Sequence, residues 1–150
     1  MVIVFDLDNT LVDELGRSLR PGIFRLLVKL QEDGHELVLW TSSPQQRAHE
    51  ILKRLELYPL FSKRIYREDY DPDNTGQVKD IRIIGGDLLV DDDPKKIDFV
   101  KSVKRKGFLI QPFRSHGLSD PKELARLERQ LNRMAMVRVV SSLMRPRTWF

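Results

Sequence analysis

The chain has 150 residues, 41% of them hydrophobic and 32% charged, which is typical of a single soluble globular domain. It contains no cysteine, which excludes disulfides, thiol catalysis and cysteine-ligated metal sites. No apolar stretch reaches the roughly 20 residues that a membrane helix needs, and no signal-peptide pattern opens the sequence. We therefore expect a cytoplasmic protein with no membrane partner.

The net charge of +4 conceals two regions of opposite sign. Residues 1–100 carry 14 Lys and Arg against 19 Asp and Glu, a net charge of −5. Residues 101–150 carry 12 against 3, a net charge of +9. A basic region of this kind can bind a polyanionic partner such as nucleic acid, or it can be a solubilising helix face. The composition leaves both interpretations open.

Strand and helix patterns alternate from the start of the chain. A short apolar run directly before Asp6 predicts a buried strand. Residues 21–34 predict a helix, because Pro21 stands at the start, Gly34 just past the end, and apolar residues recur at i, i+3, i+4 and i+7. A second strand is expected over residues 35–40. Residues 43–46 resemble a capping box that opens the next helix.

The same alternation continues through the middle of the chain. We expect a weaker strand at 64–68, a turn-rich loop at 71–76, a strand at 86–90, a helix from Pro94 to about Lys104 and a last strand at 107–113. Asp93, directly before Pro94, is well placed to cap that helix. The order predicts an α/β fold: a three-layer sandwich whose central sheet is mostly parallel.

An additional helix is predicted after this sheet. We expect residues 1–117 to form one domain and residues 118–150 a basic helical extension that packs on it or projects from it. The helix should begin at residues 119–121 and has an apolar face at spacings of three and four: Leu124, Leu127, Leu131 and Met134. This pattern stops at Arg138, which takes the next expected apolar position. The sequence does not decide whether the helix packs on the sheet or pairs with a second copy.

Polar residues stand where the predicted strands end. The candidate residues are Asp6 and Asp8 after the first strand, Thr41 and Ser42 after the second, Asp91 and Asp92 after the strand at 86–90, and Lys79 from the segment before it. In an open parallel sheet the carboxyl ends of the strands share one edge, where ligands bind. A nucleophilic carboxylate, a hydroxyl and an ammonium that bind phosphate oxygens, and a metal held by carboxylates together suit phosphoryl transfer.

Each of these residues also has a purely structural interpretation. The Asp6 and Asp8 pair could form an acidic turn, Thr41 or Ser42 could cap a helix or a turn, and Lys79 could be a solvated surface lysine. That interpretation is weakest for Asp91 and Asp92, whereas Asp93 is assigned to the helix cap. Three consecutive acids at a strand end repel one another unless a cation lies beside them.

The order and spacing of these residues resemble the haloacid dehalogenase-like (HAD) phosphatase superfamily over about residues 1–113. Its four motifs are matched by Asp6-Leu-Asp8-Asn-Thr10, by the strand end Leu39-Trp40-Thr41-Ser42, by Lys79 and by Val90-Asp91-Asp92. Within the superfamily the chain is most similar to the small C-terminal-domain phosphatases and the nuclear-LIM-interactor (NLI) interacting-factor-like proteins. The acidic motif of that branch also ends in Pro, as at Pro94 here. The chain departs from the branch at Asp92 and Asp93 and in its basic tail.

The resemblance implies a Mg2+-dependent phosphomonoesterase on a HAD-like fold. Asp6 would be the nucleophile that forms an aspartyl-phosphate. Asp8 would protonate the leaving oxygen and then activate the water that hydrolyses the intermediate. Mg2+ would be held by the Asp6 side chain, the Asp8 main-chain carbonyl and an acid of the pair Asp91 and Asp92, with Asp92 the preferred direct ligand.

The resemblance also implies how phosphate is bound. Thr41 would bind a phosphate oxygen, assisted by Ser42 or nearby backbone N–H groups. Lys79 would stabilise both the nucleophile and the phosphate. Thr10 would orient its neighbours without taking part in the reaction.

The lengths between motifs indicate an uncapped site. Only 30 residues separate Thr10 from Thr41 and 37 separate Thr41 from Lys79, and predicted elements occupy most of both spans. An open site admits bulky substrates, so we expect an exposed phosphate of a macromolecule such as a phosphoprotein, or else a small phosphate ester, and a tightly enclosed metabolite is less favoured. The alternatives are a nucleic-acid end phosphatase that uses the basic tail and, less favoured, a non-catalytic interaction module. The sequence does not indicate an oligomeric state.

Overall fold

A central sheet of five parallel strands organises the fold. A computed structural model provides the structure and describes residues 1–117 and 121–146. The strands are β1 (Val2–Phe5), β2 (Glu36–Trp40), β3 (Lys63–Ile65), β4 (Leu88–Asp91) and β5 (Lys106–Leu109). They lie in the order β3-β2-β1-β4-β5, and every neighbouring pair is parallel. The predicted α/β class is confirmed, and β1 is the middle strand.

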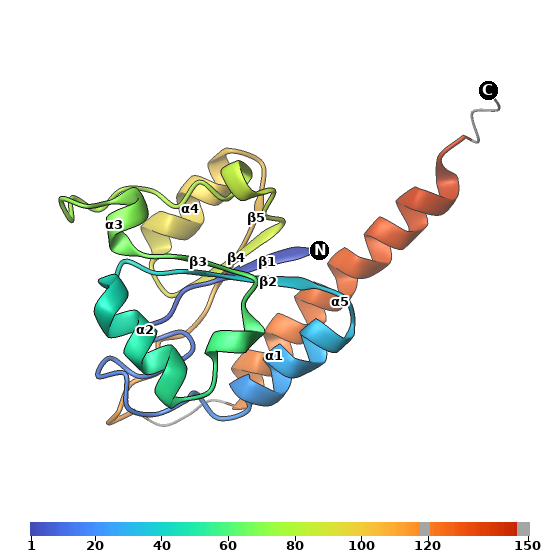
Figure 1. The fold of residues 1–150 in the computed structure, drawn as a ribbon. Coiled ribbons are helices and arrows are strands. Elements are labelled where there is room, and N and C mark those ends of the chain that lie inside the picture. The colour runs from blue at the N-terminus through green and yellow to red at the C-terminus, as the bar shows by residue number, and fades with distance from the viewer. Residues whose placement is uncertain (118–120, 147–150) are drawn as a thin grey trace.

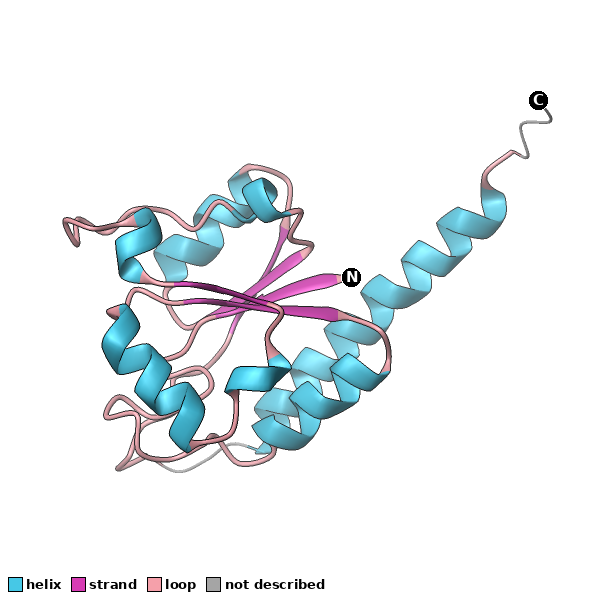
Figure 2. Ribbon diagram, in the orientation of Figure 1, coloured by secondary structure: helices cyan, strands magenta, loops and turns pink. Residues whose placement is uncertain are grey.

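Helices cover both faces of this sheet. They are α1 (Ile23–Glu32), α2 (Gln45–Arg54), α3 (Arg67–Tyr70), α4 (Pro94–Ser102) and α5 (Pro121–Met144), with short 3-10 turns η1 (Tyr58–Leu60) and η2 (Ile81–Ile84). Figure 1 shows α1, α2 and α5 on one face and α3 and α4 on the other. Figure 2 shows the strands enclosed between these two layers. The predicted three-layer sandwich is therefore confirmed.

Burial on both faces explains why the strands read as continuous apolar runs. Successive side chains of a strand point to opposite faces. Ile3 and Phe5 therefore join the core that contains α1, α2 and the start of α5, whereas Val4 joins the core beneath α4. All three side chains are fully buried. A run of this kind is what a parallel strand covered by two helical layers requires.

Two predicted local features are wrong. The strand expected at 64–68 ends at Ile65, because Tyr66 caps the short helix α3: its backbone N–H donates to Asp69 Oδ2 at 2.8 Å. The capping box expected at residues 43–46 does not form, and no side chain of that box caps α2. The Glu68 carboxylate instead accepts from the Gln45 N–H at 3.0 and 3.2 Å, so the first turn of α2 is capped by α3.

Other boundaries shift by a few residues. The last strand ends at Leu109 instead of residue 113, because the Phe113 N–H leaves the sheet and donates to Asn9 O at 2.8 Å. Asp93 caps α4 as predicted, with its side chain accepting from the Lys95 N–H. The predicted helix start at residue 119 lies outside the described residues.

Helix α5 has two different halves. The side chains of Leu124, Leu127 and Leu131 are buried in the core that α1 also contributes to. Lys29 of α1 and Glu128 pair at 3.2 Å across the two helices. Further along the helix, Arg138 pairs with Asp87 at 3.2 Å. Beyond this second contact the helix continues away from the domain (Figure 1). Among the described helices, none is long and apolar enough to span a membrane.

We expect Leu127→Ala to lower the free energy of unfolding by about 2–5 kcal/mol, because it leaves a cavity at a fully buried site. Arg129→Ala, an exposed change on the same helix, should alter it by less than about 0.5 kcal/mol. Urea titration of both variants measures the difference. Equal effects would contradict the packing of α5 on the domain.

Candidate active site

The topology brings three predicted residues from distant segments together. Asp6 follows β1 and Asp91 ends β4, and these strands are neighbours, with Phe5 paired to Val90. Lys79 enters from the segment before η2, and its Nζ donates to Asp6 Oδ1 at 3.0 Å and to Asp91 Oδ2 at 2.8 Å. Lys79 and Asp91 are each 1% exposed and Asp6 is 7% exposed. These three side chains therefore meet at the carboxyl edge of the sheet.

A third carboxylate adjoins this pair. One oxygen from each of Asp6, Asp91 and Asp92 lies within 4.8 Å of the other two. These residues line a cavity of about 190 Å3 together with Asp8, Asn9, Ser42, Lys79, Asp93 and Lys96. The Lys96 ammonium also donates to the carbonyl of Gln77, which ties the rim to the segment that carries Lys79.

Burial and charge perturb every ionisable group at the centre of the cavity. Burial raises the pKa of Asp6 to about 6, although the Lys79 charge opposes the change. Burial and the Asp6 charge raise the pKa of Asp91 to about 6 as well. Burial and Asp91 raise the pKa of Asp92. Burial disfavours the Lys79 ammonium, but the Asp6 and Asp91 carboxylates outweigh it and raise the pKa of Lys79.

The residues of the cavity fit a divalent cation. When the three acids are ionised they carry a charge of −3 against +1 on Lys79, so the centre holds two uncompensated negative charges. Burial, the main cause of the raised pKa values of Asp6 and Asp91, makes these ionised acids costly unless a cation lies beside them. Carboxylate oxygens are the ligands that Mg2+ prefers, and it usually keeps several waters. The donor set is therefore suitable for Mg2+.

Asp8 lies at the rim and has a partner that sequence reasoning missed. Arg47, in the first turn of α2, donates to both Asp8 oxygens, at 2.8 and 2.9 Å. The Asp8 side chain keeps 28% of its surface exposed. Arg47 also donates to Ser43 Oγ at 3.0 Å. The sequence shows Arg47 near the start of the helix that follows the second strand. Because 39 residues separate Arg47 from Asp8, the sequence gives no indication that they are in contact.

A second arginine that the sequence analysis did not identify, Arg20, stabilises the turn after β1. Arg20 is 6% exposed and donates to Thr10 O at 2.7 Å and to Asn9 O at 2.9 Å. Asn9 has a φ of 62°, the left-handed conformation that the turn between Asp8 and Thr10 requires. Thr10 Oγ1 donates to Asp6 Oδ2 at 3.2 Å. This contact is consistent with the orienting role expected for Thr10.

The two hydroxyl residues after β2 occupy different environments. Ser42 lines the cavity. Thr41 is 1% exposed, and its Oγ1 accepts from the Ser43 N–H at 3.0 Å, so it also stabilises the turn before α2. The Thr41 hydroxyl still has its own proton to donate. The structural and phosphate-binding interpretations of Thr41 are therefore compatible.

Comparison with protein families matches residues 1–141 to the NLI interacting factor-like phosphatase family. The chain belongs to this family. Membership identifies the protein as a phosphatase and confirms the resemblance found in the sequence. A comparison with curated proteins finds no significant match.

Solved structures share the fold of this phosphatase at low sequence identity. A hydrolase from Streptococcus pneumoniae TIGR4 superposes with a TM-score of 0.60 at 13% identity, covering 75% of this chain and 93% of its own. A protein assigned as a beta-phosphoglucomutase from Thermotoga maritima gives 0.60 at 16%, covering 83% and 90%. The core domain of a protein assigned as a phosphoglycolate phosphatase from Streptococcus pneumoniae TIGR4 gives 0.54 at 16%, covering 85% and 94%.

We expect Arg47→Ala to lower kcat of the phosphatase by about tenfold or more with little change in KM, because Asp8 loses the two contacts that position it. Arg47→Lys should restore only part of the rate, since an ammonium cannot make the bidentate contact. Arg54→Ala, on the same helix but paired with Glu50, is the control and should behave like the parent. Steady-state kinetics that show Arg47→Ala unchanged would contradict this role.

Mg2+ should stabilise the protein more at pH 7.5 than at pH 5. Asp6 and Asp91 have pKa values of about 6, so at pH 5 the metal must displace their protons, whereas at pH 7.5 they are ionised. Without metal the pH dependence has the opposite sign. Because folding raises the pKa of Asp6 and Asp91 from 3.8 to about 6, the metal-free protein loses stability as pH rises from about 4 to about 6.

Thermal unfolding with 10 mM Mg2+ or with chelator, at both pH values, measures this difference. Asp92→Asn should remove more than half of the increase in Tm at pH 7.5. Asp73→Asn, an exposed change in the loop before Lys79, should not affect it. If Mg2+ raised the Tm equally at both pH values, the assignment of these carboxylates as the metal site would be refuted.

Proposed function

We propose that this phosphatase hydrolyses phosphate monoesters through an aspartyl-phosphate on Asp6, with Mg2+ as cofactor, and acts on an exposed phosphate of a macromolecule such as a phosphoprotein. The observation that carries the proposal is the Lys79 ammonium held between Asp6 and Asp91, beside a third carboxylate. The proposal is supported because the Asp6 carboxylate, the fixed ammonium charge and carboxylates suited to a metal all line one small cavity.

In the first step an Asp6 carboxylate oxygen attacks phosphorus, a new oxygen–phosphorus bond forms, and the bond to the leaving oxygen breaks. Asp8 donates its proton to that leaving oxygen. In the second step water attacks the phosphorus of the aspartyl-phosphate and gives a proton to Asp8. Inorganic phosphate leaves and the Asp6 carboxylate is regenerated, so atoms and protons balance over the cycle.

Lys79 would act throughout the cycle as a fixed charge. Its contact with Asp91 holds the ammonium in place. When the Asp6 oxygen forms the new bond to phosphorus, that oxygen loses its negative charge, so the ammonium would contact the phosphate oxygens instead of Asp6. Ser42 lines the cavity and would bind a phosphate oxygen together with Thr41. Arg47 would hold the Asp8 carboxylate at the rim of the cavity, where its proton can pass to the leaving oxygen.

Mg2+ would be held by the Asp6 side chain, the Asp8 main-chain carbonyl and Asp92, and when bound it would neutralise charge on the transferring phosphoryl group. The contacts of Asp91 support Asp92 as the direct ligand. Asp91 Oδ1 already accepts from the Asp93 N–H at 3.0 Å, and Asp91 Oδ2 accepts from Lys79 at 2.8 Å. Both Asp91 oxygens therefore have strong partners within the protein.

The absence of a cap domain belongs to the same proposal and supports a large substrate. Between Asp8 and Thr41 the described chain consists of the loop 9–22, α1 and β2, and between Thr41 and Lys79 it consists of α2, η1, β3, α3 and the loop 71–78. None of these segments is long enough to form a second domain over a cavity of about 190 Å3. A phosphate on a flexible protein segment could reach such a site directly.

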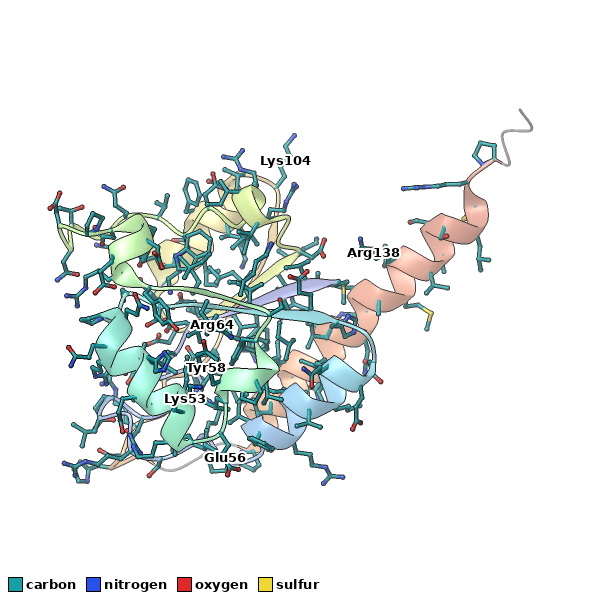
Figure 3. All side chains as sticks on the ribbon, in the orientation of Figure 1. Lys53, Glu56, Tyr58, Arg64, Lys104 and Arg138 are labelled. Atoms are coloured by element: carbon teal, nitrogen blue, oxygen red, sulfur yellow. The ribbon has the colours of Figure 1, made fainter. Side chains whose placement is uncertain are left out.

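The nucleic-acid alternative is not favoured by the position of the basic residues. Figure 3 labels Lys104, on the loop before β5, and Arg138, on α5. Both line a larger cavity of about 760 Å3 together with Met1 and Gly86, which precede β1 and β4. This basic cavity therefore lies at the amino ends of the strands, whereas the candidate active site lies at their carboxyl ends. Nucleic acid bound there would not bring its terminal phosphate to Asp6.

A substrate panel tests the proposal. With Mg2+, phosphopeptides should have a higher kcat/KM than 5′-phosphorylated oligonucleotides or small sugar phosphates, and chelator should abolish activity. Asp6→Asn should lose activity by at least about 10³-fold, because it removes the nucleophile. Beryllofluoride, a mimic of the phosphoryl group on Asp6, should raise the Tm of the parent but not of Asp6→Asn. Activity retained in Asp6→Asn would refute the mechanism, and a preference for oligonucleotides would refute the substrate class.

A further inference from the structure

The apolar face of α5 changes sides along the helix. In the first half, Leu124, Leu127 and Leu131 are buried against the domain. Arg138, which interrupts that pattern, lies on the same side of the helix as these leucines, because at about 100° per residue it is within roughly 40° of each of them. In the second half the domain side of the helix therefore carries an arginine instead of an apolar residue.

The second half has an apolar face of its own on the opposite side. Six large apolar side chains there are 45–80% exposed: Met136, Val137, Val139, Val140, Leu143 and Met144. Viewed along the helix axis, with about 100° of rotation per residue, these six side chains cover an arc of roughly 160°. The centre of this arc lies about 180° around the helix from the buried leucines. Ser141, Ser142 and Arg145 complete the polar side. The two halves of α5 are thus amphipathic in opposite directions.

This distal face has no cover within the described chain. Figures 1 and 2 show the second half of α5 projecting beyond the sheet and its helical layers. An isolated helix of this length is marginal in water, and three of its nine residues from 136 to 144 are valines, which have low helix propensity. An apolar partner against the exposed arc would therefore stabilise this part of the helix.

We propose that the distal half of α5 is a dimer interface, in which residues 136–144 of two copies of this chain pair antiparallel about Val140. The spacing of the arc is self-complementary. With Val140 on the two-fold axis, Met136 lies level with the partner's Met144, and Val137 lies level with the partner's Leu143. Six side chains per copy, at roughly 100 Å2 each, bury about 600 Å2 per copy, which is the lower end for a specific interface.

Charge selects the antiparallel orientation. Arg129 and Arg133 precede the apolar arc on the same side of the helix, within roughly 40° of its centre. In a parallel pair each would face its own copy in the partner, and like charges in contact repel. In the antiparallel pair the two rows of arginine lie at opposite ends of the interface. Arg138, which pairs with Asp87 at 3.2 Å, and Arg145 lie outside the apolar arc.

Because the chain contains no cysteine, a single introduced thiol tests this geometry directly. Val140→Cys should form a covalent dimer in high yield under mild oxidation or with a short bismaleimide, since the two residues meet at the axis. Ser142→Cys, two residues away on the opposite side, should cross-link at least tenfold less. Met136→Cys alone should cross-link poorly, but a mixture of Met136→Cys and Met144→Cys chains should give heterodimers.

Sedimentation equilibrium of the full chain provides the second measurement. The parent should be a dimer, and Val140→Glu with Leu143→Glu should make it monomeric. Ser141→Glu with Ser142→Glu adds the same charge on the polar side and should leave the dimer intact. Both double variants should keep the parent's phosphatase activity, which shows that they are folded.

Several results would overturn the proposal. A parent that stays monomeric at all concentrations would do so, as would a dimer unaffected by the glutamates on the apolar side. A parent that binds anionic vesicles as a monomer through the same residues would assign the face to a membrane surface instead. Strong self-cross-linking of Met136→Cys would replace the antiparallel pair with a parallel one.

Discussion

A buried lysine between two carboxylates is the interaction on which the site depends. Lys79 has 1% of its surface exposed, and its charge is tolerated because Asp6 and Asp91 both contact it. Removing one partner of such a group is costly, because a buried charge is left uncompensated. The β1 and β4 ends must therefore stay in register, and the segment before η2 must return to the sheet edge. The fold and the candidate chemistry are thus fixed by the same contacts.

Much of this architecture was readable from the chain. Apolar runs such as residues 2–5 and 88–90 predicted buried parallel strands because both faces of the sheet are covered, which removes the need for alternation. Acids and hydroxyls directly after these runs then had to meet at one edge. Asp6 and Asp91 were found this way. Lys79, which does not directly follow a strand, was singled out by its match to the lysine motif of the family that the chain resembles.

The features that escaped prediction depend on contacts between elements. The cap of α2 comes from Glu68, 23 residues further along the chain, so no local motif announces it. Arg47 and Arg20 contact the turn after β1 through long side chains whose direction is set by packing. In the sequence, Arg138 of α5 appeared only as an interruption of the apolar pattern. The separate apolar face around it can be recognised only when the structure shows which side of the helix packs on the domain.

The cap that α3 gives to α2 extends the support of the site beyond the residues that line the cavity. Glu68 accepts from the Gln45 N–H in the first turn of α2, and the same turn carries Arg47, which contacts Asp8. Neither Glu68 nor Gln45 lines the cavity. The position of the Asp8 carboxylate therefore depends on a helix that follows β3, on the other side of the sheet from α2.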